Sequence, residues 1–166
     1  RANYLDDYAI RNLHISTILR ENLELFFTKK CILVEGPSEK YGLPKLLKLS
    51  GCDIANFSIS IIPAWGKTKI KNYQMICKVF GIDYFTIFDS DKVEDNEPTN
   101  ENTAIENNAQ DEKKIKFSTS FEAKLGVIGD NKFQKLVKKI DELTDTNSLD
   151  REIKDCVSNL KTFIES

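Results

Sequence analysis

Residues 31–39 read Cys-Ile-Leu-Val-Glu-Gly-Pro-Ser-Glu, an apolar run that ends at a turn between two glutamates. The run has no polar alternation, which is typical of a strand buried on both faces of a parallel sheet. Ligands of open α/β sheets bind beyond the carboxyl ends of the strands, where Glu35 emerges. Gly36 lets the backbone turn, Ser38 fits a helix N-cap, and Glu39 falls in the first helical turn. The two carboxylates can therefore point into one small volume.

Two further apolar runs, residues 59–62 and 84–88, also predict buried strands. The segments between the three runs have apolar residues at helical spacing. These are Leu43, Leu46, Leu47 and Leu49 in one segment and Ile70, Tyr73, Ile76, Cys77 and Phe80 in the other. The order β-α-β-α-β with right-handed crossovers predicts a three-layer α/β sandwich.

Glycine and proline suggest where these helices begin and end. Gly51 and Gly81 stand where C-terminal caps are expected. Pro44 suggests a late start of the first helix or an irregular first turn.

The segments on either side of these strands and helices suggest that the chain has three parts. An apolar stripe predicts an N-terminal helix within residues 1–30, and residues 31–126 form the expected core. Residues 93–113 are a polar insertion, read as a loop or a weak surface helix. Residues 115–118 suggest a fourth strand, and residues 127–166 carry two amphipathic helices that would complete the domain. The stripe consists of Ile15, Leu19, Leu23 and Phe26.

The third strand runs into Asp89-Ser90-Asp91, whose period-two spacing puts both aspartates on one side. If the first and third strands are neighbours, these residues meet Glu35 and Glu39 at one edge. Such a cluster of negative charges would repel without a cation, and Mg²⁺ or Mn²⁺ prefers oxygen ligands. Each pair of acidic residues alone has a simpler explanation. A Glu-x-x-x-Glu pair is common on exposed helices, and an Asp-x-Asp pair is a frequent turn former.

The charge distribution is uneven although the net charge is only −2. The segment from Lys29 to Lys78 holds nine lysines against three acids, a net charge of +6. This pattern suits a metal site that faces a polyanion, or lysines that simply coat helix faces. The four cysteines are far apart and there is one histidine, which favours reduced core thiols over zinc ligands. No signal peptide or membrane span is recognisable, so a cytoplasmic location is expected.

The segments Val34–Glu39 and Phe88–Asp91 resemble the motif pair of the Toprim domain, which topoisomerases, primases and several nucleases share. Within that group the chain is most similar to nucleases of the OLD (overcoming lysogenisation defect) family, over residues 24–125. Other matching features are Phe26-Phe27, Leu43-Pro44, Trp65-Gly66-Lys67 and Gly81-Ile82. The resemblance implies a Toprim, Rossmann-like three-layer sandwich with a central, mostly parallel sheet.

The resemblance also implies a site. The family has a later Ser-x-Glu, which Ser120-Phe121-Glu122 matches, with Ser120 and Gly36 as secondary residues. Glu35, Glu39, Asp89, Asp91 and Glu122 would then hold two Mg²⁺ or Mn²⁺ ions for DNA cleavage, or Glu35 would transfer a proton. Candidate DNA contacts are Lys40, Lys67, Lys69 and Lys71. Lys67 is read as a turn residue that touches a phosphate or is plain surface charge. Trp65 is read as packing under its loop or stacking on a base.

Two family features are not recognisable in the sequence. OLD-type nucleases use a late lysine, and Lys132, Lys135, Lys138, Lys139, Lys154 and Lys161 all remain candidates. Members also carry an ABC-type ATPase, whose phosphate loop is missing here. We therefore expect a domain excerpt, with an ATPase in cis or in trans as partner and oligomerisation through that ATPase.

The alternatives to an endonuclease or nickase are a non-catalytic Toprim module that binds DNA or an ATPase, and a primase or topoisomerase fragment. The glycine fingerprint of a Rossmann cofactor enzyme is missing from residues 35–38.

Overall fold

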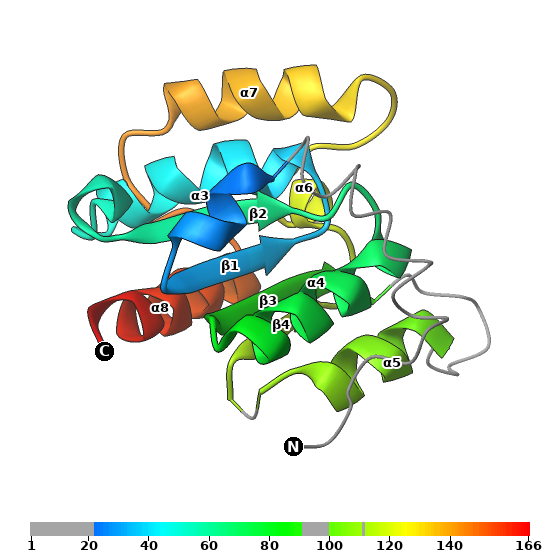
Figure 1. Ribbon diagram of the computed structural model, residues 1–166. Helices are drawn as coiled ribbons and strands as arrows, with labels where there is room; N and C mark the ends of the chain where they lie inside the picture. The colour runs from blue at the N-terminus through cyan, green and yellow to red at the C-terminus, as the bar shows by residue number, and fades with distance from the viewer. Residues whose placement is uncertain (1–21, 91–99, 111) are drawn as a thin grey trace.

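The computed structural model describes residues 22–90, 100–110 and 112–166. Its centre is a four-stranded sheet in the order β2-β1-β3-β4 (Figure 1). The strands are β1 (Lys30–Val34), β2 (Ile59–Pro63), β3 (Asp83–Asp89) and β4 (Lys114–Phe117). All three pairings are parallel, so every strand ends at the same edge. The predicted α/β sandwich and its fourth strand are confirmed.

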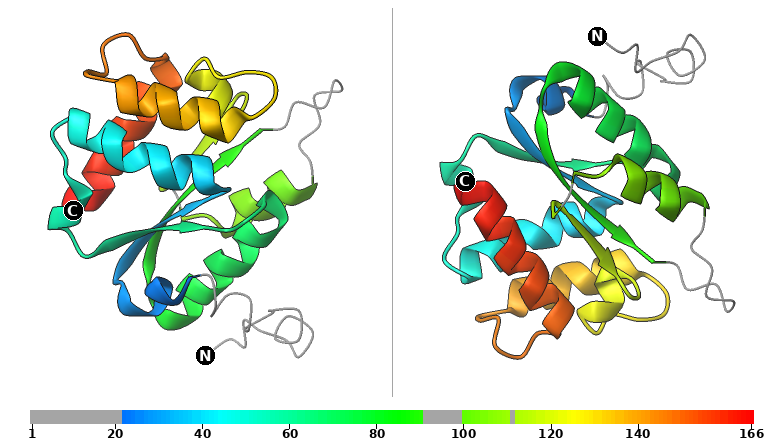
Figure 2. Two further views of the ribbon diagram at one scale, coloured as in Figure 1. Left: turned by 90° about the horizontal axis from the view of Figure 1, so that it is seen from above. Right: turned by 90° about the horizontal axis from the view of Figure 1, so that it is seen from below.

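Helices cover both faces of the sheet (Figures 1 and 2). One face carries α3 (Pro37–Leu49), α6 (Phe121–Lys124), α7 (Lys132–Glu142) and α8 (Arg151–Glu165). The other carries α4 (Lys67–Phe80), α5 (Asn100–Asn108) and the short 3₁₀ helix η1 (Leu23–Phe27).

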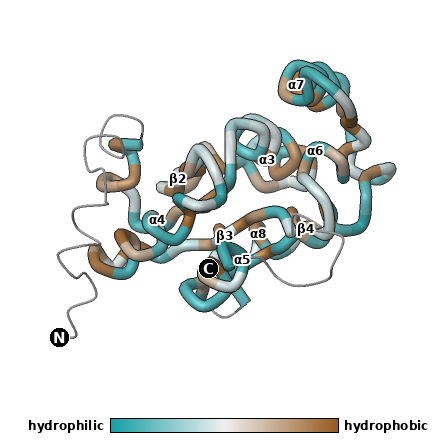
Figure 3. Tube along the Cα trace, turned by 90° about the vertical axis from the view of Figure 1, so that its right-hand side faces the viewer, coloured by the Kyte–Doolittle hydropathy of each residue, from teal (hydrophilic) through white to brown (hydrophobic). Residues whose placement is uncertain are grey.

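Each face has its own apolar core, because successive residues of a buried strand point to opposite sides. Ile32 and Val34 of β1 belong to the core under α3 and α8, whereas Cys31 and Leu33 belong to the core under α4. Figure 3 shows α7 as a mainly hydrophilic helix, and only Leu136 and Ile140 of this helix are buried. The four cysteines are buried free thiols, as predicted.

The interpretation of Pro44 as a late helix start is wrong. Helix α3 begins at Pro37, and Pro44 lies inside it. A proline without an N–H is well suited to the first helical position, so Pro37 marks the start. Pro44 costs one main-chain hydrogen bond, which the apolar contacts of Leu43, Leu46 and Leu47 offset. Ser38 is not the N-cap either, because Gly36 holds that position.

Of the two predicted glycine caps, Gly81 is confirmed, whereas Ser50 caps α3 and Gly51 follows it with φ 86°. Gly81 caps α4 with φ 69° in the left-handed region, where glycine is favoured. The C-terminal helices α7 and α8 contribute to the same core as α3. Strand β4 lies at the edge of the sheet, with Lys114 and Lys116 exposed and Phe117 buried.

Two predicted segments are described only in part. Ile15 and Leu19 of the N-terminal stripe lie outside the described residues, and Leu23 and Phe26 form a 3₁₀ helix instead of an α-helix. Of the polar insertion, residues 100–108 form α5, which packs against α4 and buries Ile105. A second short 3₁₀ helix, η2 (Ile54–Asn56), lies between α3 and β2. None of the described helices has the length and apolar character that crossing a membrane would need.

Candidate functional site

Two adjacent parallel strands, β1 and β3, deliver the first two carboxylates to the same edge of the sheet. Glu35 follows β1 directly, and Asp89 is the last residue of β3. The Glu35 carbonyl accepts a hydrogen bond from the Gly66 amide at 3.0 Å, which ties the end of β1 to the loop after β2. Asp91 lies outside the described residues. The condition that the first and third strands are neighbours is met.

Helix α3 supplies the third carboxylate. Glu39 is only 3% exposed, and its Oε2 accepts a hydrogen bond from the Gly36 amide at 3.2 Å. The glutamate therefore reaches back over the first turn of its helix, next to the end of β1. Ser38 donates instead to Oε1 of Glu122 at 2.6 Å. This bond joins α3 to α6.

Helix α6 brings the fourth carboxylate, Glu122, from a segment far along the chain. Ser120 is the N-cap of this helix and accepts a hydrogen bond from the Ala123 amide at 3.2 Å. The Phe121 amide donates to Asp89 Oδ1 at 3.2 Å. The Ser-Phe-Glu segment thus contacts both α3 and β3 at the strand ends.

The electrostatics show that these four acids share one neighbourhood. Burial raises the pKa of Glu39 to about 8, a hydrogen bond with the backbone opposes this, and Asp89, Glu122 and Glu35 raise it further. Burial also raises the pKa of Asp89 to about 7, with contributions from Glu35 and Glu122. The positive charge of Lys67 and the Phe121 amide counteract part of the Asp89 shift. Removal of the carboxylates from water is the main physical cause, and repulsion between them adds to it.

Lys67 is the site residue whose environment the sequence did not predict. It is only 8% exposed, and its amino group donates to the main-chain oxygen of Asp89 at 2.5 Å. The reading of Lys67 as plain surface charge is therefore wrong. The available signal was its place at the start of α4, just after the short loop that follows β2.

The other candidate DNA contacts are solvent-exposed. Lys69 and Lys71 lie on α4, and Lys40 on α3 forms an ion pair with Glu24 at 2.7 Å. Trp65, which packing under its loop would have buried, is 48% exposed.

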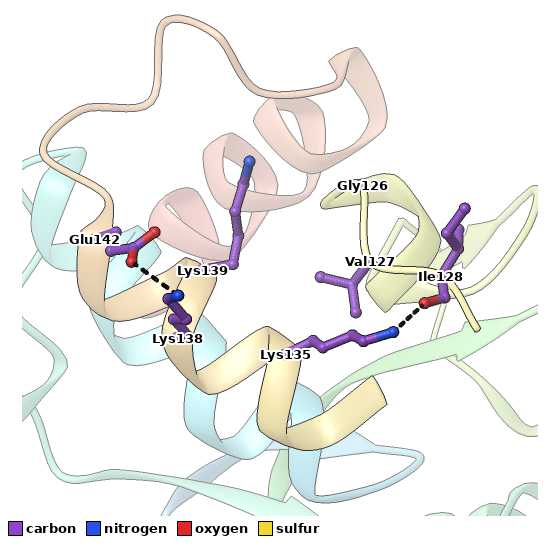
Figure 4. Close-up of a pocket in the computed structure, with 7 residues that line it drawn as sticks. All are labelled: Gly126, Val127, Ile128, Lys135, Lys138, Lys139 and Glu142. Atoms are coloured by element: carbon purple, nitrogen blue, oxygen red, sulfur yellow. Dashed lines mark hydrogen bonds and ion pairs between the residues drawn. The ribbon is translucent and has the colours of Figure 1, made fainter. Parts of the chain in front are cut away.

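The late lysines belong to α7 and α8. Three of them, Lys135, Lys138 and Lys139, line a pocket of about 380 Å³ together with residues 126–128 (Figure 4). In Figure 4, Lys135 reaches the Ile128 carbonyl and Lys138 points to Glu142, at 3.2 and 4.0 Å. Lys154 donates to the Asn147 carbonyl, and Lys161 lies 3.9 Å from Glu165. The pocket adds positive charge just after α6.

The carboxylate oxygens of the site are chemically suited to bind a hard divalent cation. Carboxylate oxygens are the ligands that Mg²⁺ and Mn²⁺ prefer. A cation would offset the burial and the repulsion that together raise the Glu39 and Asp89 pKa values. Within residues 22–90, 100–110 and 112–166, no three acidic, thiol or imidazole side chains already converge on one ion position. Binding would therefore require side-chain rotation or a ligand outside this set, such as Asp91.

Comparison with known proteins gives independent information on the chain. Residues 26–91 match the family described as "Overcoming lysogenization defect protein-like, TOPRIM domain". This range begins at the end of η1 and contains the first three strands and the helices between them. None of the curated proteins compared with the chain matches it.

Solved structures with a similar fold include two C-terminal regions of OLD proteins. The region from Xanthomonas campestris pv. campestris has a TM-score of 0.60 and 12% identity, covering 86% of this chain and 96% of that one. The region from Burkholderia pseudomallei has a TM-score of 0.59 and 14% identity, covering 83% and 99%. At this identity the likeness shows a shared fold, which extends well beyond residues 26–91.

Proposed function

We propose that this chain is a divalent-metal-dependent DNA endonuclease or nickase, because residues 26–91 match the OLD-like TOPRIM domain family that their motifs resemble. The observation that carries the proposal is the gathering of carboxylates from β1, α3, β3 and α6 at one sheet edge. Burial, together with their mutual repulsion, raises the pKa values of Glu39 and Asp89. Such a site is suited to holding metal ions against a phosphate.

In this proposal Glu35, Glu39, Asp89 and Glu122 hold the metal ions, with Asp91 as a further predicted ligand. Two bound divalent ions would supply an activated water and offset the charge on the leaving oxygen. The chain's own contacts orient the ligands, since Ser38 holds Glu122 and the Phe121 amide holds Asp89. Lys67 places a positive charge beside Asp89, where a scissile phosphate would add negative charge.

The test is nicking of supercoiled plasmid DNA. We expect activity with Mg²⁺ or Mn²⁺ and none with EDTA. Asp89→Ala and Glu35→Ala should each reduce the rate by at least about a hundredfold, as expected for loss of a group that stabilises the transition state. Glu142→Gln, an exposed carboxylate on α7, is the matched control and should cleave like the wild type. Undiminished nicking by the double variant Glu35→Ala, Asp89→Ala would refute the proposal.

A second candidate function is a Toprim module that binds DNA or an ATPase without cutting. The observation in its favour is that the described side chains do not converge on one ion position. Calorimetry separates the two functions. Binding of Mn²⁺ that is lost in Asp89→Ala supports the nuclease, whereas no heat at millimolar Mn²⁺ with retained DNA binding supports the module.

We also propose an ATPase partner. Both solved neighbours are described as C-terminal regions, and the resemblance implies an ABC-type ATPase, in cis or in trans. DNA as substrate and oligomerisation through the ATPase belong to the same proposal.

A further inference from the structure

The loop after β2 presents an aromatic side chain at the edge that carries the carboxylates. Trp65 is 48% exposed, although tryptophan is among the residues that folding usually buries most. Its φ of 56° lies in the left-handed region, which is uncommon for residues other than glycine. Non-glycine residues held in such conformations cluster at functional sites.

Hydrogen bonds on both sides of Trp65 fix this loop to β1. The Ala64 amide donates to the Val34 carbonyl at 2.8 Å, and the Gly66 amide donates to the Glu35 carbonyl at 3.0 Å. Lys67 then anchors the loop to Asp89 of β3. The Trp65 backbone is therefore held beside both carboxylate-bearing strands, while its indole stays half exposed to solvent.

We propose that Trp65 stacks on an unpaired nucleobase and makes single-stranded or locally unpaired DNA the preferred substrate. This inference rests on the proposed nuclease function and names its substrate class. Stacking on an aromatic side chain needs a free face of the base, which a paired base inside a duplex does not offer. Lys69 and Lys71, exposed on the helix that follows the loop, supply positive charge for the adjoining phosphates.

Trp65 is the only tryptophan of the chain, so its fluorescence reports this contact directly. The probe is a fluorescein-labelled thymidine oligonucleotide of about 12 nucleotides, within the usual site size of single-strand binders. It is compared with a blunt duplex of equal length. An Asp89→Asn background prevents cleavage during the titration. We expect unlabelled single strand to quench the Trp65 emission, with the same midpoint as the anisotropy of the labelled strand.

Substitutions at the same position provide the second measurement. Trp65→Ala and Trp65→Gly should weaken single-strand binding roughly tenfold or more, and duplex binding less than about twofold. Trp65→Phe keeps an aromatic face and should stay within about threefold of the parent protein. Glycine is compatible with the left-handed backbone, so Trp65→Gly keeps the test valid should alanine disturb the loop. Phe27→Ala removes an aromatic that is 87% exposed before β1 and should leave both affinities unchanged.

Three results would overturn the inference. These are no binding of single-stranded DNA, binding by anisotropy without a change in emission, and unchanged affinity in both Trp65→Ala and Trp65→Gly. Its failure is distinguishable from failure of the proposed function. Metal-dependent nicking with unchanged affinity in those variants overturns only the role of Trp65. Quenching and a loss of affinity without any nicking contradict the nuclease and support the stacking role.

Discussion

Glu39 and Asp89 are the two buried carboxylates of the site, at 3% and 9% exposure. Both have raised pKa values, so the folded chain holds their protons more tightly than the unfolded chain does. Stability contributed by such a group is fully present below its ordinary pKa and is lost as the pH rises through the folded pKa. In the absence of metal, the site should therefore destabilise the fold in neutral and mildly alkaline solution.

Glu39→Gln should remove this penalty. The amide oxygen can still accept the hydrogen bond from Gly36, but it carries no charge. In EDTA we expect equal stability near pH 4.5 and a gain for the variant above about pH 8, by roughly 1–2 kcal/mol of unfolding free energy.

Urea unfolding at both pH values checks the expectation. Mn²⁺ should raise the midpoint of the wild type more than that of Glu39→Gln, because ligand binding stabilises the folded state. Glu142→Gln, which changes an exposed carboxylate, should follow the wild type throughout. A variant less stable than the wild type above pH 8 would show that the charged form of Glu39 is not penalised by burial and repulsion.

The sequence predicted where the acidic residues lie relative to the strands and helices. It did not predict how deeply the neighbouring Lys67 is buried or how far Trp65 is exposed. Glu35, Glu39 and Asp89 follow strands or begin a helix, which is a local property and therefore predictable. The burial of Lys67 and the exposure of Trp65 depend on how the β2–α4 loop lies against β1 and β3. Tertiary contacts of this kind have no periodic signal in the sequence.

Among the secondary-structure elements, β4, α6 and α8 are joined by a polar junction around Glu152. This residue accepts hydrogen bonds from the Ser118 amide and hydroxyl, at 2.9 and 2.6 Å, and from Lys124 at 2.6 Å. Burial raises the pKa of Glu152, but the bonds from Lys124 and Ser118 outweigh it and lower the pKa to about 2. The junction holds α6, which carries Glu122, against α8.

Glu152→Gln should therefore have a pH-dependent cost. A depressed folded pKa contributes stability above the ordinary value of 4.5, and this stability is lost as the pH falls towards about 2. We expect the variant to be less stable by about 1 kcal/mol at neutral pH, a figure kept small because the side chain is partly exposed. The difference should shrink as the pH falls below 4.5.

Thermal unfolding across that pH range is the measurement. Asp155→Asn on the same helix removes a highly exposed pair with Arg151 and should change stability by less than about 0.5 kcal/mol at any pH. A Glu152→Gln deficit that stays constant down to the lowest pH would contradict the assigned cause.

Helix boundaries show what element-level prediction can and cannot achieve. The strands follow from their apolar runs, the end of α4 from its glycine cap, and the presence of α7 and α8 from apolar periodicity. Helix α3 begins earlier than predicted, because Pro44 lies inside it. Proline disfavours the interior of an isolated helix, but here the packing of the fully buried Leu43, Leu46 and Leu47 outweighs that cost.

For the whole molecule, the strand order places the two carboxylate-bearing strands at the centre of the sheet. The order β-α-β-α-β predicted a parallel sheet but left the adjacency of the first and third strands as a condition. Adjacency depends on which face each helix covers, and α3 and α4 cover opposite faces. The position of Glu122 follows from packing of the late helices on α3, which no local signal encodes.

Gly42 lies where the late helices pack closely on α3. A Cβ at this position would lie 3.1 Å from Cε1 and Cζ of Phe121 and 3.4 Å from Cδ1 of Ile140. Helices α3, α6 and α7 therefore meet at a residue without a side chain. Gly42→Leu should destabilise the fold by about 1–3 kcal/mol through overpacking. It should also reduce nicking, because Phe121 positions Asp89 and precedes Glu122.

Chemical unfolding and the plasmid assay at a temperature where the variant is folded check both effects. Lys48→Leu adds the same side chain on the exposed side of α3 and should change neither by much. Full stability of Gly42→Leu would mean that the three helices separate more easily than their contacts indicate.

The exposed lysines of the edge strand β4 affect whether a strand from another protein can pair with this sheet. Exposed main-chain groups at a sheet edge invite pairing with a strand from another molecule, and charged lysines discourage it. Lys114 and Lys116 are exposed on β4, and Lys116 is also engaged by Glu106 at 2.6 Å. Strand addition at this border is thus disfavoured, and copies of the chain are protected there from edge-to-edge aggregation. A partner that extends the sheet would have to add to β2 at the opposite border.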